Sequence, residues 1–465
     1  MFKKEKQGFS RAFWTANTVE LLERGAYYGV FIVITLYLSR IMGFTDIEAG
    51  LISGIFSGGL YLLPTFTGAY ADKIGFKYSL IVAFTFLSIG YFGLAILPTV
   101  LESAGLVDFS EGIKFTGLNE SVYRWSIIPV MLILMFGGSF IKSVITGTIA
   151  KETTESNRAQ GFSIFYMMVN IGSFSGKTVV KPLRDAMGDM GLIYINYFSA
   201  ILTIIALVLI VIFFKSSRHE GEGKSIREIV ISLYKVLTNG RLLALIFIIT
   251  GFWIVQQQLY ATMPKYVTRL AGDNAAISWY ANVNPLVVVL SVTLITRLMA
   301  KRTPLFSMIS GMFIMPLSAL VMASGNLLDR TEISFGGMSM HPIALMMVAG
   351  IAIQGLAESF ISPRYLQFFS LQAPKGEEGL YLGFSHLHSF FSSVLGFGIS
   401  GFLLNKYCPD PKLFSSYQEW QAASSNAHYI WYFFVFISIF SALSLILYGM
   451  ITKRIDKKTI KDNLR

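Results

Sequence analysis

The sequence predicts an all-α membrane protein with twelve transmembrane helices. Of its 465 residues, 54% are hydrophobic and 14% are charged, and the mean hydropathy is +0.59. Soluble domains carry roughly 25% charged residues. Apolar stretches of about 20 residues, the length that crosses a bilayer core of roughly 30 Å as a helix, recur along the whole chain. Strand-length alternation is absent, so a transmembrane β-barrel is disfavoured.

The apolar runs and the polar breaks between them predict where each helix lies, six before the longest charged break and six after it. The expected ranges are about 11–39, 47–71, 77–98, 124–150, 157–184, 190–215, 241–268, 275–300, 304–325, 341–371, 376–405 and 427–453. The long break turns amphipathic, as expected of a helix lying on a membrane surface.

We therefore expect three parts in the chain. An N-terminal six-helix bundle covers 1–215, a cytoplasmic linker with an amphipathic helix covers 216–240, and a C-terminal six-helix bundle covers 241–465. The oligomeric state expected for such a chain is a monomer surrounded by membrane lipid.

The charge distribution predicts the orientation of the chain. The formal net charge of +11 is spread over short loops instead of one soluble face, so nucleic-acid binding is disfavoured. Most of these basic residues fall on one side of the expected helices, which is the positive-inside pattern. It predicts a plasma (inner) membrane protein with both termini in the cytoplasm and a retained first span.

Several classes of chemistry are disfavoured by what the sequence lacks. Cys408 is the only cysteine, which excludes an intramolecular disulfide and a cysteine-based metal cluster. No phosphate-binding glycine loop, partnered nucleophile or metal-ligand cluster is recognisable. We expect neither an enzyme nor an ATP-driven pump, with no catalytic residues, no metal and no cofactor; protons would be the coupling ion.

Three ionisable side chains lie on the first helix, in Glu20-Leu-Leu-Glu23-Arg24. Each would cost roughly 2.5–3.5 kcal/mol facing lipid near the bilayer centre, so they must face protein or water. At 100° per residue they share one stripe of the helix with Tyr27. One arginine cannot neutralise two glutamates, and Lys142 on the fourth helix lies at a similar depth as a second cation.

This set of charges admits two interpretations. A glutamate paired with Lys142 can be displaced by protonation or by a substrate carboxylate that competes for the same lysine, which suffices for proton-coupled carboxylate binding. Alternatively, the charges form a static buried ion pair that holds the first and fourth helices together.

The loop between the second and third helices resembles a known signature. Two six-helix bundles around a central path are the arrangement of major facilitator transporters. Their signature G-x-x-x-D-[RK]-x-G-[RK]-[RK] is similar to Gly68-Ala-Tyr-Ala-Asp72-Lys-Ile-Gly75-Phe-Lys77, with Phe76 at a place often basic. The resemblance implies gating contacts of Asp72 and Lys77 with a neighbouring helix end and its dipole. A basic loop that merely follows the topology rule is the alternative.

Further motifs resemble the proton-dependent oligopeptide transporter (POT/PTR) family of that superfamily. Residues 20–29, Glu-Leu-Leu-Glu-Arg-Gly-Ala-Tyr-Tyr-Gly, are similar to its pattern E-x-x-E-R-[FG]-x-Y-Y. Phe165-Tyr166-Met-Met-Val-Asn170-Ile-Gly172-Ser173 is similar to F-Y-x-x-I-N-x-G-S. Three more matches are Gly137 to Lys142, Asn284-Pro285, and Glu358-Ser-Phe-Ile-Ser362-Pro363.

The resemblance implies a proton-coupled symporter that imports di- and tripeptides by alternating access. The proton-coupling residues would then be Glu20, Glu23, Arg24 and Lys142. Lys142 would also bind the peptide carboxylate, and Glu358 would receive the peptide ammonium group, which gives charge complementarity at both ends of the substrate. The remaining substrate-binding residues implied are Tyr28, Asn170, Gln257 and Asn284.

Two departures from the family pattern leave the substrate open. In Phe252-Trp253-Ile-Val-Gln256-Gln257-Gln258 the family's titratable glutamate is replaced by Gln257. On the fifth helix Lys177, Lys181 and Arg184 share one basic face, which either extends to the outer interface or attracts an anion. A proton-coupled transporter of another carboxylate-bearing or anionic solute is therefore the alternative. A non-transporting receptor or structural protein is disfavoured by the costly buried charges.

Overall fold

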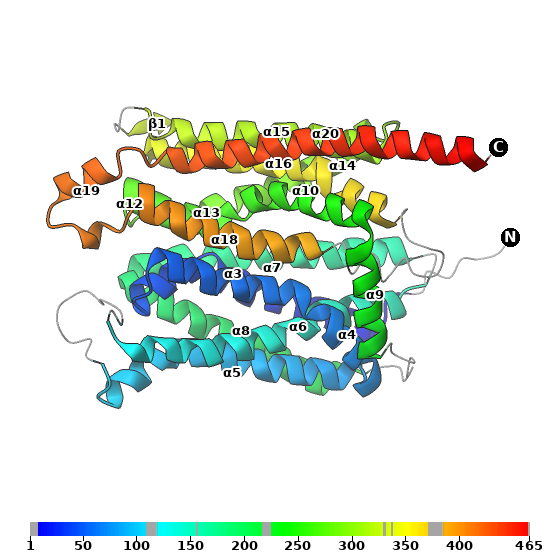
Figure 1. Cartoon of the computed structure of the whole chain (residues 1–465). Helices are drawn as coiled ribbons and strands as arrows, with labels where there is room; N and C mark the ends of the chain where they lie inside the picture. Colours follow the sequence, from blue (N-terminus) through cyan, green and yellow to red (C-terminus); the bar gives the residue numbers. More distant parts are fainter. Residues whose placement is uncertain are drawn as a thin grey trace. The chain divides into compact units, whose positions relative to one another are not determined.

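The structure is a computed structural model that describes residues 8–107, 118, 120–154, 157–215, 225–328, 332–335, 338–370, 384 and 386–463. Up to the linker its helices are α1 (Arg11–Phe31), α2 (Ile34–Leu36), a π-helical turn (Tyr37–Ile41), α3 (Asp46–Leu62), α4 (Pro64–Ile74), α5 (Phe76–Ser103), a 3₁₀ turn (Val122–Ser126), α6 (Ile127–Lys151), α7 (Arg158–Met187), a 3₁₀ turn (Gly188–Met190) and α8 (Gly191–Phe213) (Figure 1).

The linker contains α9 (Ile226–Thr238). Beyond it lie α10 (Gly240–Gln256), α11 (Gln258–Ala261), α12 (Met263–Ala271), α13 (Ile277–Ala281), α14 (Val283–Leu298), α15 (Pro304–Ser324), β1 (Ile333–Phe335), β2 (Met338–Met340), α16 (Pro342–Ser370), α18 (Leu387–Tyr407), a 3₁₀ turn (Pro411–Leu413), α19 (Tyr417–Ala423) and α20 (Tyr429–Asn463). The two short strands pair antiparallel, with Ile333 opposite Met340.

The described residues confirm an all-α membrane protein. Ten stretches are long and apolar enough to cross a membrane, or eleven if α1 and the segment Ile34–Ile41 form one span bent by 44°. One stretch, Gln160–Phe213, has 54 residues and contains both α7 and α8, separated by a short turn. The described residues thus give ten or eleven candidate spans where the sequence predicts twelve.

Four of the predicted helices are interrupted in the structure. The second divides into α3 and α4 and the eighth into α13 and α14, and the first and seventh are broken as well. The first, expected over 11–39, ends as α1 at Phe31 and continues through α2 into a π-helical turn. The seventh, expected over 241–268, divides into α10, α11 and α12. Its breaks fall at Gln257 and Thr262, where side-chain amide and hydroxyl groups bond to α18 and to the preceding turn. These bonds join side chains to side chains, and two of them hold the broken helix against α18.

The chain folds as two compact units. Unit 1 contains residues up to Val33, Arg40–Gly43 and Gly59–Ile229. Unit 2 contains Ile34–Ser39, Phe44–Gly58 and Val230–Arg465. Unit 2 therefore includes most of α3, although α3 precedes the linker by more than 150 residues.

Glycines set the closest helix packing inside unit 1. In this unit α1 packs on α7 and α8, and α5 packs on α6 and α8. A methyl group added at Gly176 of α7 would overlap the backbone of Gly25 in α1, and one added at Gly172 would lie 2.8 Å from Cβ of Arg24. Small residues four apart let two membrane helices touch through their backbones.

Unit 2 is held together by apolar packing and by a second glycine seam. Here α15 lies beside α16 and α20, and α10 packs on α18 and α20 (Figure 1). A methyl group at Gly50 of α3 would lie 2.5 Å from the carbonyl oxygen of Phe397 in α18, and one at Gly54 would lie 3.0 Å from that of Ser393. The backbone of α3 is thus in contact with α18.

Local sequence signals explain how several helices begin and end. Thr45 and Glu48 form a capping box at the start of α3, because the Thr45 amide donates to Glu48 and the Glu48 amide donates to the Thr45 hydroxyl. Gly75 of the predicted signature loop separates α4 from α5 with φ of 86°, a value that side chains other than glycine rarely adopt.

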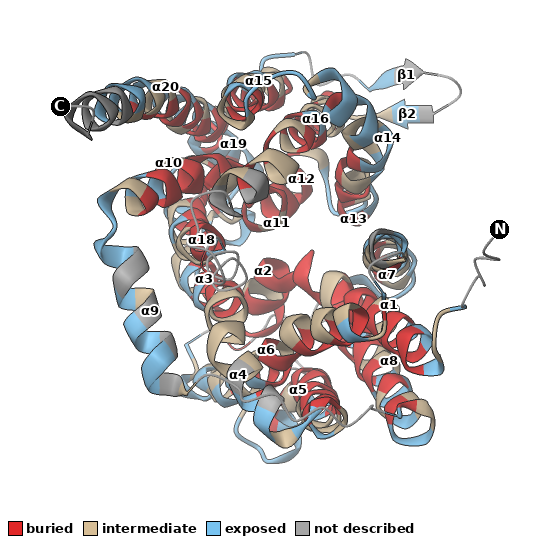
Figure 2. Ribbon diagram, turned by 90° about the vertical axis from the view of Figure 1, so that its right-hand side faces the viewer, coloured by how far each residue is buried: buried red, intermediate tan, exposed pale blue. Residues whose placement is uncertain are grey.

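The amphipathic helix expected in the linker is α9. Most of its described surface is exposed (Figure 2). Val230, Ile231, Tyr234 and Leu237 present large exposed apolar side chains at helical spacing. A helix with this pattern is suited to the boundary between lipid headgroups and acyl chains.

Candidate functional site

The buried charges of α1 form one compact ion cluster in unit 1. Nε of Arg24 lies 3.2 Å from Oε1 of Glu20, and the same guanidinium is bonded to Oε2 of Glu23. Glu20 and Glu23 are almost fully buried. The single stripe predicted for these three residues is therefore present, and one arginine binds both carboxylates.

The second oxygen of Glu20 is not satisfied. Oε2 of Glu20 is buried and accepts no hydrogen bond from the described residues. A buried carboxylate oxygen without a donor is costly, whereas a protonated carboxyl group buries no charge. Two carboxylates and one guanidinium sum to a single negative charge, and a proton on Glu20 would remove it.

Lys142 stands apart from this ion cluster. Its ammonium group lies 3.8 Å from the centroid of the Tyr61 ring, and within the described residues no ion pair joins it to Glu20 or Glu23. Its charge nevertheless acts on both carboxylates. The direct pair expected from the sequence is thus replaced by a cation–π contact, because Arg24 already occupies the carboxylates.

Gly172 and Gly176 let α7, which carries residues of the family motif, pack closely on α1. The ammonium group of Lys177 lies over the ring of Tyr28 in α1, 5.5 Å from the ring centroid. Asn170 is partly exposed and donates through Nδ2 to the carbonyl of Tyr166, one turn earlier in α7. Tyr28, Lys177 and the charges of α1 therefore belong to one helix pair.

The basic face predicted on α7 is not uniform. Lys177 is 1% exposed, whereas Lys181 forms an ion pair with Asp185. Arg184 is 9% exposed. Only Lys177 combines deep burial with a position beside a predicted pocket residue, Tyr28.

A second polar site lies in unit 2 around Glu358. Nε2 of Gln256 on α10 donates to Oε2 of Glu358 on α16 at 2.9 Å, and Nδ2 of Asn284 on α14 lies 3.4 Å from the same oxygen. Three helices thus converge on one carboxylate. Amide donors orient this carboxylate without neutralising its charge, so it is suited to receive an ammonium group.

Gln257, predicted to bind substrate, contacts α18 and not Glu358. It is 8% exposed, and its Nε2 donates to Oγ of Ser393 on α18 at 3.2 Å. That hydroxyl also bonds to Ser57 of α3. The adjacent Gln256, which the motif comparison passed over, is the residue that reaches Glu358, since a one-residue shift turns a helical side chain by 100°.

The predicted gating loop is described in part. Nζ of Lys77 donates to the carbonyl of Val211 near the end of α8, at 3.1 Å. This contact matches the expected interaction with a helix end, where free carbonyls attract cations. Asp72 belongs to α4, and its side chain lies outside the described residues.

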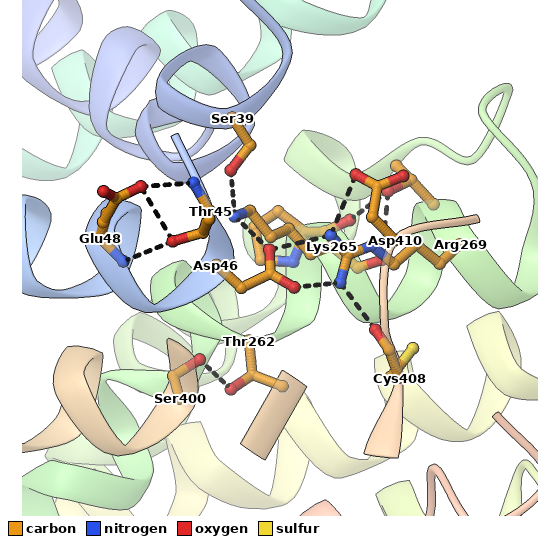
Figure 3. Close-up of polar contacts among 12 residues, drawn as sticks. Ser39, Thr45, Asp46, Glu48, Thr262, Lys265, Arg269, Ser400, Cys408 and Asp410 are labelled. Carbon is orange, nitrogen blue, oxygen red and sulfur yellow. Dashed lines mark hydrogen bonds and ion pairs between the residues drawn. The ribbon is translucent and has the colours of Figure 1, made fainter. Parts of the chain in front are cut away.

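Unit 2 also contains a charge cluster that the sequence reasoning missed. We call Asp46, Lys265, Arg269 and Asp410 the Asp46 cluster. Figure 3 shows Asp46 bonded to both Lys265 and Arg269 of α12. Only the spacing of Lys265 and Arg269, one turn apart in the predicted seventh helix, hinted at such a site. Their shared partner Asp46 lies more than 200 residues away.

Comparison with known proteins identifies the family. A sequence model of the Major Facilitator Superfamily matches residues 14–329. The chain belongs to this superfamily. Among its relatives, multidrug resistance protein MdtH of Photorhabdus laumondii is 21% identical over 381 residues, covering 81% of this chain and 82% of the relative. Dipeptide and tripeptide permease B of Photorhabdus luminescens is 25% identical over 426 residues, covering 83% and 86%.

Solved structures match this major facilitator protein over nearly its whole length. A structure reported for substrate recognition in proton-dependent oligopeptide transporters has a TM-score of 0.65 and 17% identity, and the match covers 95% of this chain and 99% of that one. The fold class is therefore confirmed. The predicted resemblance to the oligopeptide transporter family is confirmed by the permease relative, and the solved structure shares its fold.

Proposed function

We propose that this major facilitator protein is a proton-coupled symporter that imports di- and tripeptides by alternating access. The observation that carries the proposal is the ion cluster of α1, in which Arg24 binds both Glu20 and Glu23 while one oxygen of Glu20 has no donor among the described residues. A buried site with one excess negative charge is a site for a transported proton.

The substrate would be held by charges at its two ends. Lys142, beside Tyr61, supplies a cation for the peptide carboxylate. Glu358, oriented by Gln256 and Asn284, supplies an anion for the ammonium group. Relatives that are named peptide permeases, such as dipeptide and tripeptide permease B, support this substrate class. Arrival of the carboxylate at Lys142 weakens the attraction of that lysine for the nearby glutamates and so favours their protonation.

The proposal also covers the orientation of the chain in the membrane, its gate and its oligomeric state. The positive-inside pattern supports cytoplasmic termini in a plasma (inner) membrane, and the gating role of Asp72 and Lys77 is supported by the contact of Lys77 with the end of α8. We also propose that the monomer is the working unit. The two six-helix bundles, over 1–215 and 241–465, would alternate in access around the substrate.

Uptake into proteoliposomes with an imposed inward proton gradient tests the proposal. Labelled dipeptide should accumulate, unlabelled di- and tripeptides should compete, and peptide addition should stimulate proton entry. If dipeptides neither compete nor stimulate proton entry while an organic anion or a cationic drug does, the peptide assignment is wrong. An empty-liposome control and a protonophore control separate transport from leakage.

An anionic solute is the second candidate function. The buried Lys177 beside Tyr28 favours it, because it adds a buried cation to the helix that also carries Asn170. The same uptake assay decides between the two candidates when neutral dipeptides, acidic dipeptides and dicarboxylates compete at equal concentration. Stronger competition by dicarboxylates than by any peptide favours the anionic solute.

A further inference from the structure

Three helices of unit 2 meet at one end of the unit, where α15 ends and α16 and α20 begin. In this unit α15 packs on both α16 and α20. A methyl group added at Gly325, directly after α15, would lie 2.9 Å from Cα of Ile343 in α16. Because so close an approach leaves the backbone little freedom, it fixes the position of the next residue, Asn326. The side chain of Asn326 then reaches the turn before α20.

The hydrogen bonds of Asn326 fix the protonation state of His428. Nδ2 of Asn326 lies 3.2 Å from the carbonyl oxygen of Ser425 and 3.2 Å from Nδ1 of His428. A carbonyl oxygen can only accept, so the amide presents its N–H groups on this side. Nδ1 of His428 must therefore accept as well, which leaves the imidazole neutral with its proton on Nε2. We call Asn326, Ser425 and His428 the Asn326 clasp.

Protonation of His428 would open the Asn326 clasp. Both nitrogens of an imidazolium donate, so its Nδ1 would face an amide that also donates. Rotating the amide would offer Oδ1 of Asn326 to the imidazolium, but that oxygen would then lie against the carbonyl oxygen of Ser425. In the closed clasp Oδ1 is buried and accepts no hydrogen bond from the described residues, so the amide is held through Nδ2. Either orientation loses a hydrogen bond, and the closed clasp therefore requires the neutral imidazole.

The surroundings of His428 also favour the neutral imidazole. Burial lowers the pKa of His428, because an imidazolium would lose part of its hydration there. The rings of Tyr429 and Tyr432 pack against it, with centroids at 4.7 and 5.4 Å, and limit the access of water. From α18, Lys406 lies over the ring of Tyr407, which contacts Tyr429. The charged group described on that side is thus a cation, which does not stabilise an imidazolium.

A second histidine at this end depends on the same unprotonated nitrogen. Nδ1 of His341 accepts from the backbone N–H of Ile343 at 3.2 Å, in the first turn of α16. A side-chain acceptor in this position caps the start of a helix. An imidazolium could not accept there, and its charge is unfavourable at a helix N-terminus. Glu332, in the hairpin that leads to His341, accepts from the hydroxyl of Ser339 within that hairpin. Protonation thus acts against the starts of both α16 and α20.

We infer that this end of unit 2 is acid-sensitive: the Asn326 clasp joins α15 to the turn before α20 while His428 is neutral, and protonation of His428 releases it. Loss of the His341 cap on α16 assists the release. With the proposed cytoplasmic termini this end lies on the outer side, from which protons would enter, and only this placement rests on the proposed function. An acidic exterior then loosens the outer ends of three helices.

The direction of the pH dependence follows from the lowered pKa of His428. As the pH falls, the unfolded chain takes up the proton at about pH 6.5, before the folded protein does. The contribution of the clasp to the free energy of unfolding is therefore complete above that pH. It is lost as the pH falls through the pKa of His428 in the folded protein.

The melting temperature of the full-length protein in detergent, measured from pH 8 to pH 5, tests the inference. Acid should lower it in the unaltered protein by roughly 2 °C more than in His428→Gln, whose amide oxygen accepts from Asn326 at every pH. His386→Gln, which removes a histidine at the end of α18 away from Tyr407, is the matched control and should retain the full decrease. An equal decrease in His428→Gln and the unaltered protein would overturn the clasp.

Hydrogen–deuterium exchange tests the same contact without relying on global unfolding. In the unaltered protein the protection factors of segments 324–328 and 424–432, corrected for the intrinsic exchange rate at each pH, should fall at least threefold from pH 8 to pH 5. Asn326→Asp should reverse the direction, because a carboxylate accepts from the imidazolium and repels the carbonyl oxygen of Ser425. Constant protection in the unaltered protein, or an equal fall in Asn326→Asp, would contradict the inference.

Replacing His341 with Asn separates the two histidines. The amide oxygen still caps α16 but does not titrate, so exchange in 342–346 should lose its pH dependence while exchange in 424–432 keeps it. An unchanged pH dependence in 342–346 would remove His341 from the inference. Both measurements are made in detergent and need no transport. Absence of peptide uptake by the unaltered protein would therefore refute the proposed function, while the exchange experiment would still decide on the clasp.

Discussion

Arg24 contacts Glu20 through one carboxylate oxygen only, at 3.2 Å from Nε, and the other oxygen stays buried without a donor among the described residues. The same guanidinium is bonded to Glu23, its neighbour in sequence. Because one cation serves two carboxylates, the protonation state of Glu20 decides whether this part of α1 is charged or neutral. This relationship makes Glu20, together with Glu23, the proposed carrier of the transported proton.

Replacing Glu20 with Gln should uncouple transport from the proton gradient. The amide keeps a hydrogen-bonding group beside Arg24 but cannot release a proton. We expect gradient-driven accumulation of dipeptide to fall at least tenfold, while gradient-free counterflow persists, both measured in proteoliposomes. Glu23→Gln should give the same pattern, and Glu48→Gln in the capping box of α3 is the control for loss of a carboxylate. Unchanged accumulation in Glu20→Gln would remove this residue from the coupling role.

Replacing Tyr61 with Leu should weaken peptide binding through Lys142. The ring face of Tyr61 holds the ammonium group at 3.8 Å, and such contacts contribute roughly 0.5–2 kcal/mol. We expect the KM for dipeptides to rise roughly two- to thirtyfold, as this free energy implies. Tyr61→Phe retains the ring and should keep a KM close to that of the unaltered protein; an equal rise in both variants would contradict the cation–π contact.

Replacing Glu358 with Gln should impair recognition of the peptide ammonium group. A hydrogen bond to a charged group contributes roughly 1.5–3 kcal/mol, so we expect the apparent affinity for dipeptides to fall roughly 10- to 150-fold. Competition by N-acetylated dipeptides should change much less, because they lack the ammonium group. A parallel loss for both ligand sets would show that Glu358 acts on structure and not on the amino end.

Replacing Gly176 with Ala should destabilise unit 1. The added methyl group would overlap the backbone of Gly25, where no flexible side chain can move aside. Overpacking of this kind typically costs about 1–3 kcal/mol of the free energy of unfolding. The melting temperature in detergent should therefore fall. Gly240→Ala is the control, since no atom lies within 4 Å of the added group; equal melting temperatures would show that α1 and α7 can separate without cost.

Replacing Lys177 with Gln tests its effect on substrate charge. If its ammonium group attracts anionic substrates, competition by acidic dipeptides and dicarboxylates should weaken at least threefold relative to neutral dipeptides. Lys181→Gln is the matched control, because Asp185 already neutralises that lysine. An unchanged ratio in Lys177→Gln would mean that this lysine has a structural role beside Tyr28.

Much of the fold followed from the order of apolar and polar residues. Runs of about 20 apolar residues require helices in a membrane, because only an internally bonded backbone can enter it. The stripe of Glu20, Glu23 and Arg24 likewise followed from helical periodicity. The helix breaks after Phe31 and at Gln257 could not be predicted in this way. At Gln257 the side chain bonds to Ser393 of another helix, a contact that periodicity does not specify.

The sequence by itself determined the helices, the superfamily and the residue types near the membrane interior. Only the tertiary structure decided which charges meet. Arg24, and not Lys142, binds the two glutamates, and Gln256, and not Gln257, reaches Glu358. Asp46 finds Lys265 across more than 200 residues. Periodicity places a side chain on a face of its own helix, but the partner of that face depends on how glycine seams and helix breaks bring distant helices together.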